Sequence, residues 1–185
     1  MNRRIIVVGA LVLAIALLAV LSRSQNEPKE KTKHYESSSI GIAFDYPNNY
    51  FLEVKDTGSP QRKRTAIILT EDTEENRLVR EGKTPPREGP VAITVDIFQN
   101  SEKLSAEGWV RGMSYSNFKL SSDEPTIFTY KDRDAVSYRW SGLYEGQSVV
   151  FAHKENIVML SVTFIAPSDP IITVFEDMLE SVKLK

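Results

Sequence analysis

The stretch DAVSYRWSGLYEGQSVVFAHKENIVMLSVTFIA, residues 134–166, is the part of the chain from which the predicted fold can be built. It contains three apolar-patterned runs, which cover residues 135–141, 147–153 and 157–166. Only short connectors separate these runs, and short connectors join antiparallel neighbours, because parallel strands need a long crossover. The stretch is therefore predicted to form a three-stranded antiparallel meander.

The side-chain pattern within these runs indicates which strand lies deepest. In the first run Val136, Tyr138 and Trp140 alternate with small or polar residues, which is typical of a strand with one buried face. In the last run both alternating sets are apolar, with Val158, Leu160, Val162 and Phe164 on one face and Ile157, Met159 and Ile165 on the other. A strand that is apolar on both faces is expected to be central in its sheet.

Further patterned runs extend the sheet and add two helices. Strands are predicted at 40–46, 50–54, 65–70, 91–98 and 126–130, with a tight polar connection at 56–60. Ser105 is expected to cap a short helix that reaches Met113 and buries Trp109, and Asp169 to cap an amphipathic helix that begins at Pro170. We therefore predict an α+β fold in which an antiparallel sheet of about six to eight strands is flanked by helices and preceded by one N-terminal hydrophobic helix.

Residues 1–24 are typical of a targeting segment. Arg3 and Arg4 precede an uncharged, mostly aliphatic run at residues 5–21. A helix of that length covers about 25 Å, near the lower limit for a bilayer span, and it is longer than the usual core of a signal peptide. We expect a retained single-pass membrane anchor, with cleavage after Ser24 and secretion as the alternative. The basic pair directly before the apolar run favours an extracytoplasmic location for the rest of the chain.

The composition of the chain after residue 24 limits the kinds of partner that it can bind. Residues 1–24 hold three arginines and no acidic residue, so the net charge of −2 for the whole chain becomes about −5 for the rest. This acidic balance argues against nucleic acid as a partner. The chain has no cysteine, which excludes disulfides, thiolate metal ligands and a cysteine nucleophile. Residues 25–38 are polar without an apolar period and are predicted to form a tether, which places the folded domain at residues 39–185.

The longest segment without a predicted strand or helix covers residues 71–90. It is rich in charged residues, proline and glycine, and irregular segments of this length in compact domains are often functional or disordered. Its first part, residues 71–75, is acidic but lacks the alternating oxygen ligands and central glycine of a calcium loop, so no metal site is expected. We interpret the segment as a solvated loop, with Arg80 and Arg87 as candidate contacts to a partner.

With these elements assigned, the chain resembles the PsbP-like (Mog1/PsbP) family, named for the extrinsic oxygen-evolving protein of photosystem II. The resemblance rests on IAFDYPNNY at residues 42–50, on the helix around Trp109, on the strand that begins DAVSY at Asp134, on the meander and on the C-terminal helix that runs to Leu184. Members of that family often carry glycine where this chain has Asp134. The resemblance implies an antiparallel sheet sandwiched between helices, a binding or assembly role, and a place in the membrane-anchored bacterial branch.

Few residues offer catalytic chemistry. The two histidines are His34 in the expected tether and His153 at the end of a predicted strand, and no Gly-x-Ser-x-Gly motif presents a serine. Neither histidine lies in a spacing typical of a zinc site. Glu145 and Glu155 are expected at neighbouring turns, but acidic residues are too abundant here for one such pair to be informative. His153 is interpreted as a hydrogen-bonded histidine at a strand end, and no catalytic residue, metal or cofactor is predicted.

The sequence thus favours a membrane-tethered extracytoplasmic module that binds or assembles with a protein partner in the cell envelope and has no catalytic activity of its own. The membrane is expected to be contacted through residues 5–21. Two alternatives stay open. One is an envelope hydrolase or metal-dependent enzyme that uses His153, and the other is a carrier of a small ligand or lipid in the groove between sheet and helices.

Overall fold

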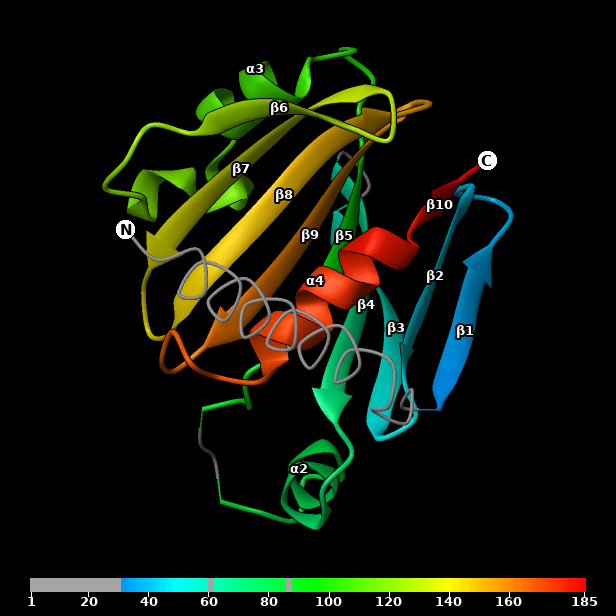
Figure 1. The fold of residues 1–185 in the computed structure, drawn as a ribbon, viewed down its shortest axis with the longest axis vertical. Helices are drawn as coiled ribbons and strands as arrows, with labels where there is room; N and C mark the ends of the chain where they lie inside the picture. The colour runs from blue at the N-terminus through cyan, green and yellow to red at the C-terminus, as the bar shows by residue number, and fades with distance from the viewer. Residues whose placement is uncertain (1–30, 60–61, 86–87) are drawn as a thin grey trace, which may run out of the picture. The chain divides into compact units, whose positions relative to one another are not determined.

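The computed structural model describes residues 31–59, 62–85 and 88–185, and Figure 1 shows their fold. The strands are β1 (Thr32–Ser37), β2 (Ile42–Pro47), β3 (Tyr50–Ser59), β4 (Arg62–Glu71), β5 (Ile93–Gln99), β6 (Thr126–Tyr130), β7 (Arg133–Ser141), β8 (Glu145–His153), β9 (Asn156–Phe164) and β10 (Lys183–Leu184). The helices are α2 (Glu74–Arg80), α3 (Ala106–Gly112) and α4 (Ile171–Ser181), with short 3-10 helices η1 (Ser114–Ser116) and η2 (Phe118–Leu120). The predicted α+β class is confirmed.

A seven-stranded antiparallel sheet carries the fold. Its strand order is β3-β4-β5-β9-β8-β7-β6, so the meander forms one half of it. β9 is the fourth strand and pairs with β5 on one side and β8 on the other. The antiparallel meander and the central position of its last strand are therefore both confirmed.

Each face of this sheet supports its own hydrophobic core. On the first face, which α4 crosses toward the viewer of Figure 1, Leu160 of β9 packs with Phe151 and Phe175. On the second face Met159 of β9 packs with Trp109 of α3, whose side chain is 4% exposed. Each large side chain buried in this way contributes roughly 2 kcal/mol. The prediction that Trp109 belongs to the core is confirmed.

A second sheet of three strands, ordered β1-β2-β10, packs into the core of the first face. β1 falls within residues 25–38, so the prediction of a tether is wrong for Thr32–Ser37, which pair antiparallel with β2. Only Tyr35 and Ser37 of β1 are partly buried, and Tyr35 stacks on Phe44 with ring centroids 5.1 Å apart. A single aromatic contact in an exposed edge strand leaves no apolar period for pattern analysis to detect.

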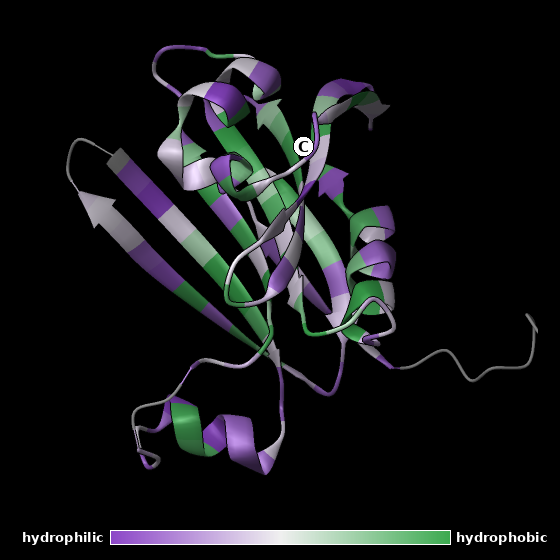
Figure 2. Cartoon of the chain, turned by 90° about the vertical axis from the view of Figure 1, so that its left-hand side faces the viewer, coloured by the Kyte–Doolittle hydropathy of each residue, from purple (hydrophilic) through white to green (hydrophobic). Residues whose placement is uncertain are grey.

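The hairpin of β3 and β4 is longer than predicted. Both strands have ten residues, and their ladder runs from Tyr50 opposite Glu71 to Ser59 opposite Arg62. The expected tight connection at residues 56–60 is therefore wrong, because residues 56–59 continue β3. Figure 2 shows this hairpin extending beyond the rest of the sheet. The outer half of β3 is exposed, so backbone pairing extends the strand where side-chain alternation gives no signal.

The predicted cap of α3 is confirmed, because Ser105 Oγ accepts the N–H of Gly108 at 3.1 Å. α4 begins at Ile171 with Pro170 as its cap residue, one residue later than predicted, and Asp169 Oδ1 accepts the N–H of Ile171 at 3.2 Å. α4 ends at Ser181, and the chain then forms β10, which pairs with β2. The last residues are therefore strand rather than the end of a helix.

Several predictions fall on parts of the chain that are not described. The N-terminal hydrophobic helix at residues 5–21, cleavage after Ser24 and the partner contact of Arg87 all lie outside the described residues. Within the described ranges, none of the helices combines the length and the apolar character that a membrane span requires. The membrane anchor stays a prediction.

One charged residue lies deep in the second face of the large sheet. The side chain of Asp96 on β5 is 3% exposed, and its Oδ1 accepts hydrogen bonds from Arg64 Nε at 3.0 Å and Nη2 at 2.7 Å. The Arg64 guanidinium also lies 5.4 Å from the ring centre of Phe98. Burial raises the pKa of Asp96, and Arg64 opposes that increase. A buried carboxylate with a partner adds little net stability, but removal of the partner is costly.

We expect Arg64→Ala to lower the free energy of unfolding by about 3 kcal/mol, because it leaves the Asp96 carboxylate buried without its counter-charge. The pKa of Asp96 then rises further in the folded protein only, so the folded state binds a proton at higher pH than the unfolded state does. The loss should therefore be larger at pH 8 than at pH 5. Urea unfolding at both pH values measures this, with Lys63→Ala on the exposed neighbour as the control. A loss of stability that does not depend on pH would contradict the role of Arg64 as the counter-charge of Asp96.

Candidate interaction surface

His153 occupies a structural position at the end of β8. Its side chain is 2% exposed, and its Nε2–H donates to the carbonyl oxygen of Gly41 at 3.1 Å. Gly41 has φ of 76°, and a β-carbon there would lie 2.6 Å from the carbonyl oxygen of Lys185. Glycine is therefore required where the β1–β2 turn meets the histidine and the C-terminal residue. The interpretation of His153 as a hydrogen-bonded histidine at a strand end is confirmed.

The surroundings of His153 favour the neutral imidazole. Burial lowers the pKa of His153, and the positive charges of Arg133 and Lys154 lower it further. With Nε2–H bonded to Gly41, Nδ1 is a buried acceptor that has no hydrogen-bond partner among the described residues. A general base accepts a proton through its unprotonated ring nitrogen, and that nitrogen, Nδ1, is buried with no hydrogen-bond partner among the described residues.

The other residues considered for catalysis are kept apart. Glu145 begins β8 and Glu155 follows its last residue, so the strand separates them by roughly 25–30 Å and the expectation of neighbouring turns is wrong. His34 lies on β1, where its Nδ1 is 2.6 Å from Oδ1 of Asp45. In the part of the chain that the structure describes, no group of three or more histidine, aspartate or glutamate side chains is placed to hold a metal ion.

We expect His153→Ala to lower the free energy of unfolding by about 2 kcal/mol, because it removes the bond to Gly41 and leaves a cavity. In the native chain the unfolded histidine binds a proton more readily than the folded one. Stability should therefore fall as the pH drops from about 7 through the unfolded pKa of about 6.5 toward the lowered folded pKa.

Urea unfolding between about pH 7.5 and pH 5 measures this dependence, which should be weaker in His153→Ala. The exposed His34 supplies the control, because His34→Ala leaves the buried ring in place and should retain the contribution of His153. The same pH dependence in the native chain and in His153→Ala would show that the buried ring is not its source.

Helix α2 lies inside the segment 71–90, so the prediction of an irregular loop is wrong over Glu74–Arg80. Thr73 caps the helix by accepting the N–H of Asn76 at 3.2 Å, and two glutamates occupy the first turn, where the helix dipole favours negative charge. None of its residues is buried, so the apolar stripe that marks most helices is missing. Figure 2 shows α2 projecting from the body of the domain with one narrow apolar band.

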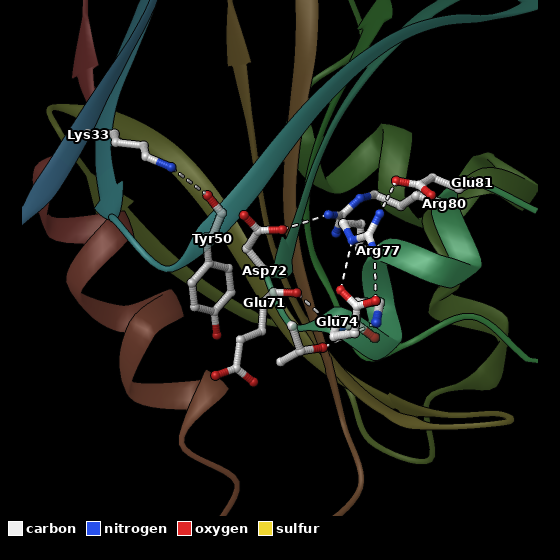
Figure 3. A network of polar contacts seen from close by, with 10 residues as sticks. Lys33, Tyr50, Glu71, Asp72, Glu74, Arg77, Arg80 and Glu81 are labelled. Carbon is white, nitrogen blue, oxygen red and sulfur yellow. Dashed lines mark hydrogen bonds and ion pairs between the residues drawn. The ribbon is translucent and has the colours of Figure 1, made fainter. Parts of the chain in front are cut away.

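Arg80 connects α2 to the large sheet. Its Nη2 lies 2.6 Å from Oδ1 of Asp72, and its guanidinium carbon lies 4.0 Å from the ring centre of Phe51 on β3. Among the described residues, the ion pairs of Arg77 are with Glu74 of the helix and with Glu81 at its C-terminal cap, as Figure 3 shows. Arg80 therefore positions α2, and its contact with a partner stays a prediction.

A shallow hollow of about 690 Å³ lies beside α2. It is lined by Glu71, Thr73, Glu75, Asn76, Glu88, Gly89, Pro90, Val91, Tyr144 and Ile165. The Tyr144 hydroxyl donates to the carbonyl oxygen of Gly89 at 2.7 Å and so joins the β7–β8 turn to the segment before β5. Three carboxylates among the lining residues give the hollow a negative charge.

Two strongly exposed apolar residues belong to this region, because Ile165 lines the hollow and Leu143 directly precedes the lining residue Tyr144. Leu143 is 67% exposed and Ile165 is 73% exposed. The β8–β9 ladder ends with the pair of Glu145 and Phe164, so Leu143 lies two residues before that end along the chain and Ile165 one residue after it. We define the foot surface as Leu143, Tyr144, Ile165, Glu75 and Glu88. An exposed apolar patch with a charged rim is typical of a protein contact site.

Sequence reasoning missed the foot surface. Ile165 was expected on a buried face of the last strand, which is wrong because β9 ends at Phe164. The one local signal is the presence of Leu143 and Tyr144 in a predicted turn, where polar residues are the usual choice. Their position beside residues 88–91 depends on the pairing of strands far apart in the sequence, which no local pattern reports.

We expect Arg80→Ala to speed amide hydrogen exchange throughout α2, because it removes both the ion pair with Asp72 and the contact with Phe51. The free energy of global unfolding should change by about 1 kcal/mol or less, since α2 has no buried residue. Arg77→Ala is the matched control, and its loss of ion pairs within the helix should have a smaller effect. Equal exchange rates in the two variants would show that Arg80 does not attach the helix.

Comparison with known proteins identifies the fold. No family model matches the chain, and no curated protein matches it. The solution structure of cyanobacterial PsbP (CyanoP) from Synechocystis sp. PCC 6803 is similar, with a TM-score of 0.55 and 13% identity, over 86% of this chain and 96% of that chain. A crystal structure from Bacteroides thetaiotaomicron VPI-5482 matches with a TM-score of 0.46 and 9% identity, over 83% of this chain and 48% of that chain.

The similarity to the cyanobacterial protein shows that the fold is PsbP-like, an antiparallel sheet with helices on both faces. This confirms the resemblance drawn from the opening strand, the tryptophan helix and the meander. At 13% identity, the structural similarity establishes the fold alone. The function has to be argued from the surface residues of this chain.

Proposed function

We propose that this chain is a membrane-tethered extracytoplasmic module, of the membrane-anchored bacterial kind, that binds or assembles with a protein partner in the cell envelope without catalysis of its own. The foot surface is the observation that carries the proposal, because it exposes Leu143 and Ile165 beside a hollow with acidic walls. The apolar run at residues 5–21 supplies the proposed anchor.

The point at which the chain enters the domain supports this arrangement. Thr32, the first residue of β1, pairs with Pro47, and the carbonyl oxygen of the nearby Asn49 accepts the N–H of Asp72 at 2.7 Å. Lys33 of β1 also bonds to the start of β3, because its Nζ donates to the carbonyl oxygen of Tyr50 at 3.2 Å (Figure 3). β1 therefore begins at the end of the domain that carries α2. With the proposed anchor at residues 5–21, this favours a partner at or near the membrane.

The chemistry of the foot surface indicates the kind of partner. Its apolar centre requires apolar side chains on the other protein, because burial of such area drives most association. Its acidic rim, which includes Glu75 and Glu88, favours basic residues around that apolar contact. We therefore propose an envelope protein with an apolar patch bordered by lysine or arginine.

The double variant Leu143→Ser, Ile165→Ser tests the proposal. Both side chains are exposed, so the free energy of unfolding should change by about 0.5 kcal/mol or less. Recovery of the partner after mild crosslinking of intact cells should fall about tenfold or more, because loss of apolar contacts at the centre of an interface costs at least roughly 1.4 kcal/mol.

Val54→Ser is the matched control, since Val54 is an apolar residue that is 49% exposed on the distant edge strand β3. It should leave recovery of the partner unchanged. Mass spectrometry of the crosslinked species identifies the partner. The proposal fails if the native chain recovers only background proteins, or if both variants recover the same partner in equal amounts.

A further inference from the structure

Among the described residues, the two sheets have four edge strands, each paired on one side only. They are β3 and β6 in the large sheet and β1 and β10 in the small one. The strands β1, β3 and β10 each contain at least one charged residue. β6, with the sequence TIFTY, contains neither a charged residue nor a proline. Edge strands are usually protected from pairing with another chain by such residues. Among the described edges, β6 alone lacks this protection.

The hairpin geometry shows which backbone groups of β6 are available. The turn residues Lys131 and Asp132 have φ of 48° and 62°, as a two-residue type I′ turn requires, and they join the pair Tyr130–Arg133. A turn of this type is closed by a hydrogen-bonded pair, and such pairs then alternate along the ladder. The even-numbered residues of β6 therefore bond to β7, whereas Ile127 and Thr129 direct their N–H and C=O groups to the open edge.

We propose that β6 pairs antiparallel with β6 of a second copy of this chain, around a two-fold axis at Phe128. In this register Ile127 of each copy lies opposite Thr129 of the other, so all outward backbone groups of both residues bond to the second copy. Registers shifted by two residues place Pro125, which has no N–H, or the turn residue Lys131 opposite one of them. The symmetric register is therefore the one that satisfies both strands.

The charges that flank β6 do not set the direction of pairing, because Asp123 and Glu124 precede the strand and residues of both signs, Lys131, Asp132, Arg133 and Asp134, follow it. The antiparallel direction follows instead from the outward backbone groups of Ile127 and Thr129, which the symmetric register satisfies in both copies. Ile127 is 57% exposed and would be covered by the second copy. A two-fold contact uses the edge of both copies and stops at a dimer.

The absence of cysteine from the chain allows a direct test of the register. The full-length variants Ile127→Cys and Thr129→Cys are purified in detergent, oxidised separately, and oxidised as a mixture. The mixture should yield roughly fivefold more crosslinked dimer than either variant alone, because opposite residues lie about 5 Å apart and like residues lie diagonally at about 7–8 Å. Both positions are exposed, so the fold should be retained.

Val54→Cys and Asp56→Cys on β3 form the matched control, since they have the same spacing on a charged edge and should crosslink only at the level of random collision. Preferential crosslinking of each β6 variant with itself would indicate another register and overturn the proposal. Equal yields in the mixture and the separate variants, or no β6 crosslink, would do the same.

Thr129→Pro supplies a second measurement, because it removes an outward N–H and leaves the bonds to β7 in place. Light scattering of the full chain in detergent should show a dimer that forms with increasing concentration in the native protein, and a strong loss of that dimer in the variant. A native chain that stays monomeric, or a variant that dimerises as well as the native chain, would contradict pairing through this edge.

Discussion

Burial of β9 on both of its faces is the constraint on which the rest of the structure depends. Leu160 and its neighbours at alternate positions lie in one core, while Ile157 and Met159 lie in the other. A strand of this kind has to be covered on two sides, so the chain supplies α4 and the small sheet for one face and α3 with the 3-10 helices for the other. The layered architecture follows from that requirement.

Buried polar groups between neighbouring strands help to fix the register in which the strands pair. Asp96 and Arg64 connect β5 to β4, and Ser148 and Ser161 connect β8 to β9 through hydroxyl oxygens 2.8 Å apart. Such groups cost free energy when they lose their partners, so they disfavour shifted pairings more than they add to stability. His153 acts in the same way between the two sheets, where its bond to Gly41 ties the β1–β2 turn to the end of β8.

The surfaces proposed for binding lie where these constraints are weakest. α2 contributes no buried side chain and is attached mainly through Arg80, and β6 has no strand on its outer side among the described residues. Exposed ion pairs contribute at most about 1 kcal/mol, so changes in these regions cost the core little. A scaffold with a double core can therefore present an interaction surface at its foot without a loss of stability.

The strands of the meander, the central place of β9, the core position of Trp109, the cap of α3 and the position of α4 could all be predicted, because each leaves a periodic or capping signal in consecutive residues. β1, α2 and the foot surface could not. β1 is held by pairing with β2, and α2 by the contact of its own Arg80 with Phe51 on β3. The foot surface is held by the meeting of the β7–β8 turn with residues before β5. Sequence patterns record which side chains avoid water, whereas these features arise from contacts between residues far apart in the chain.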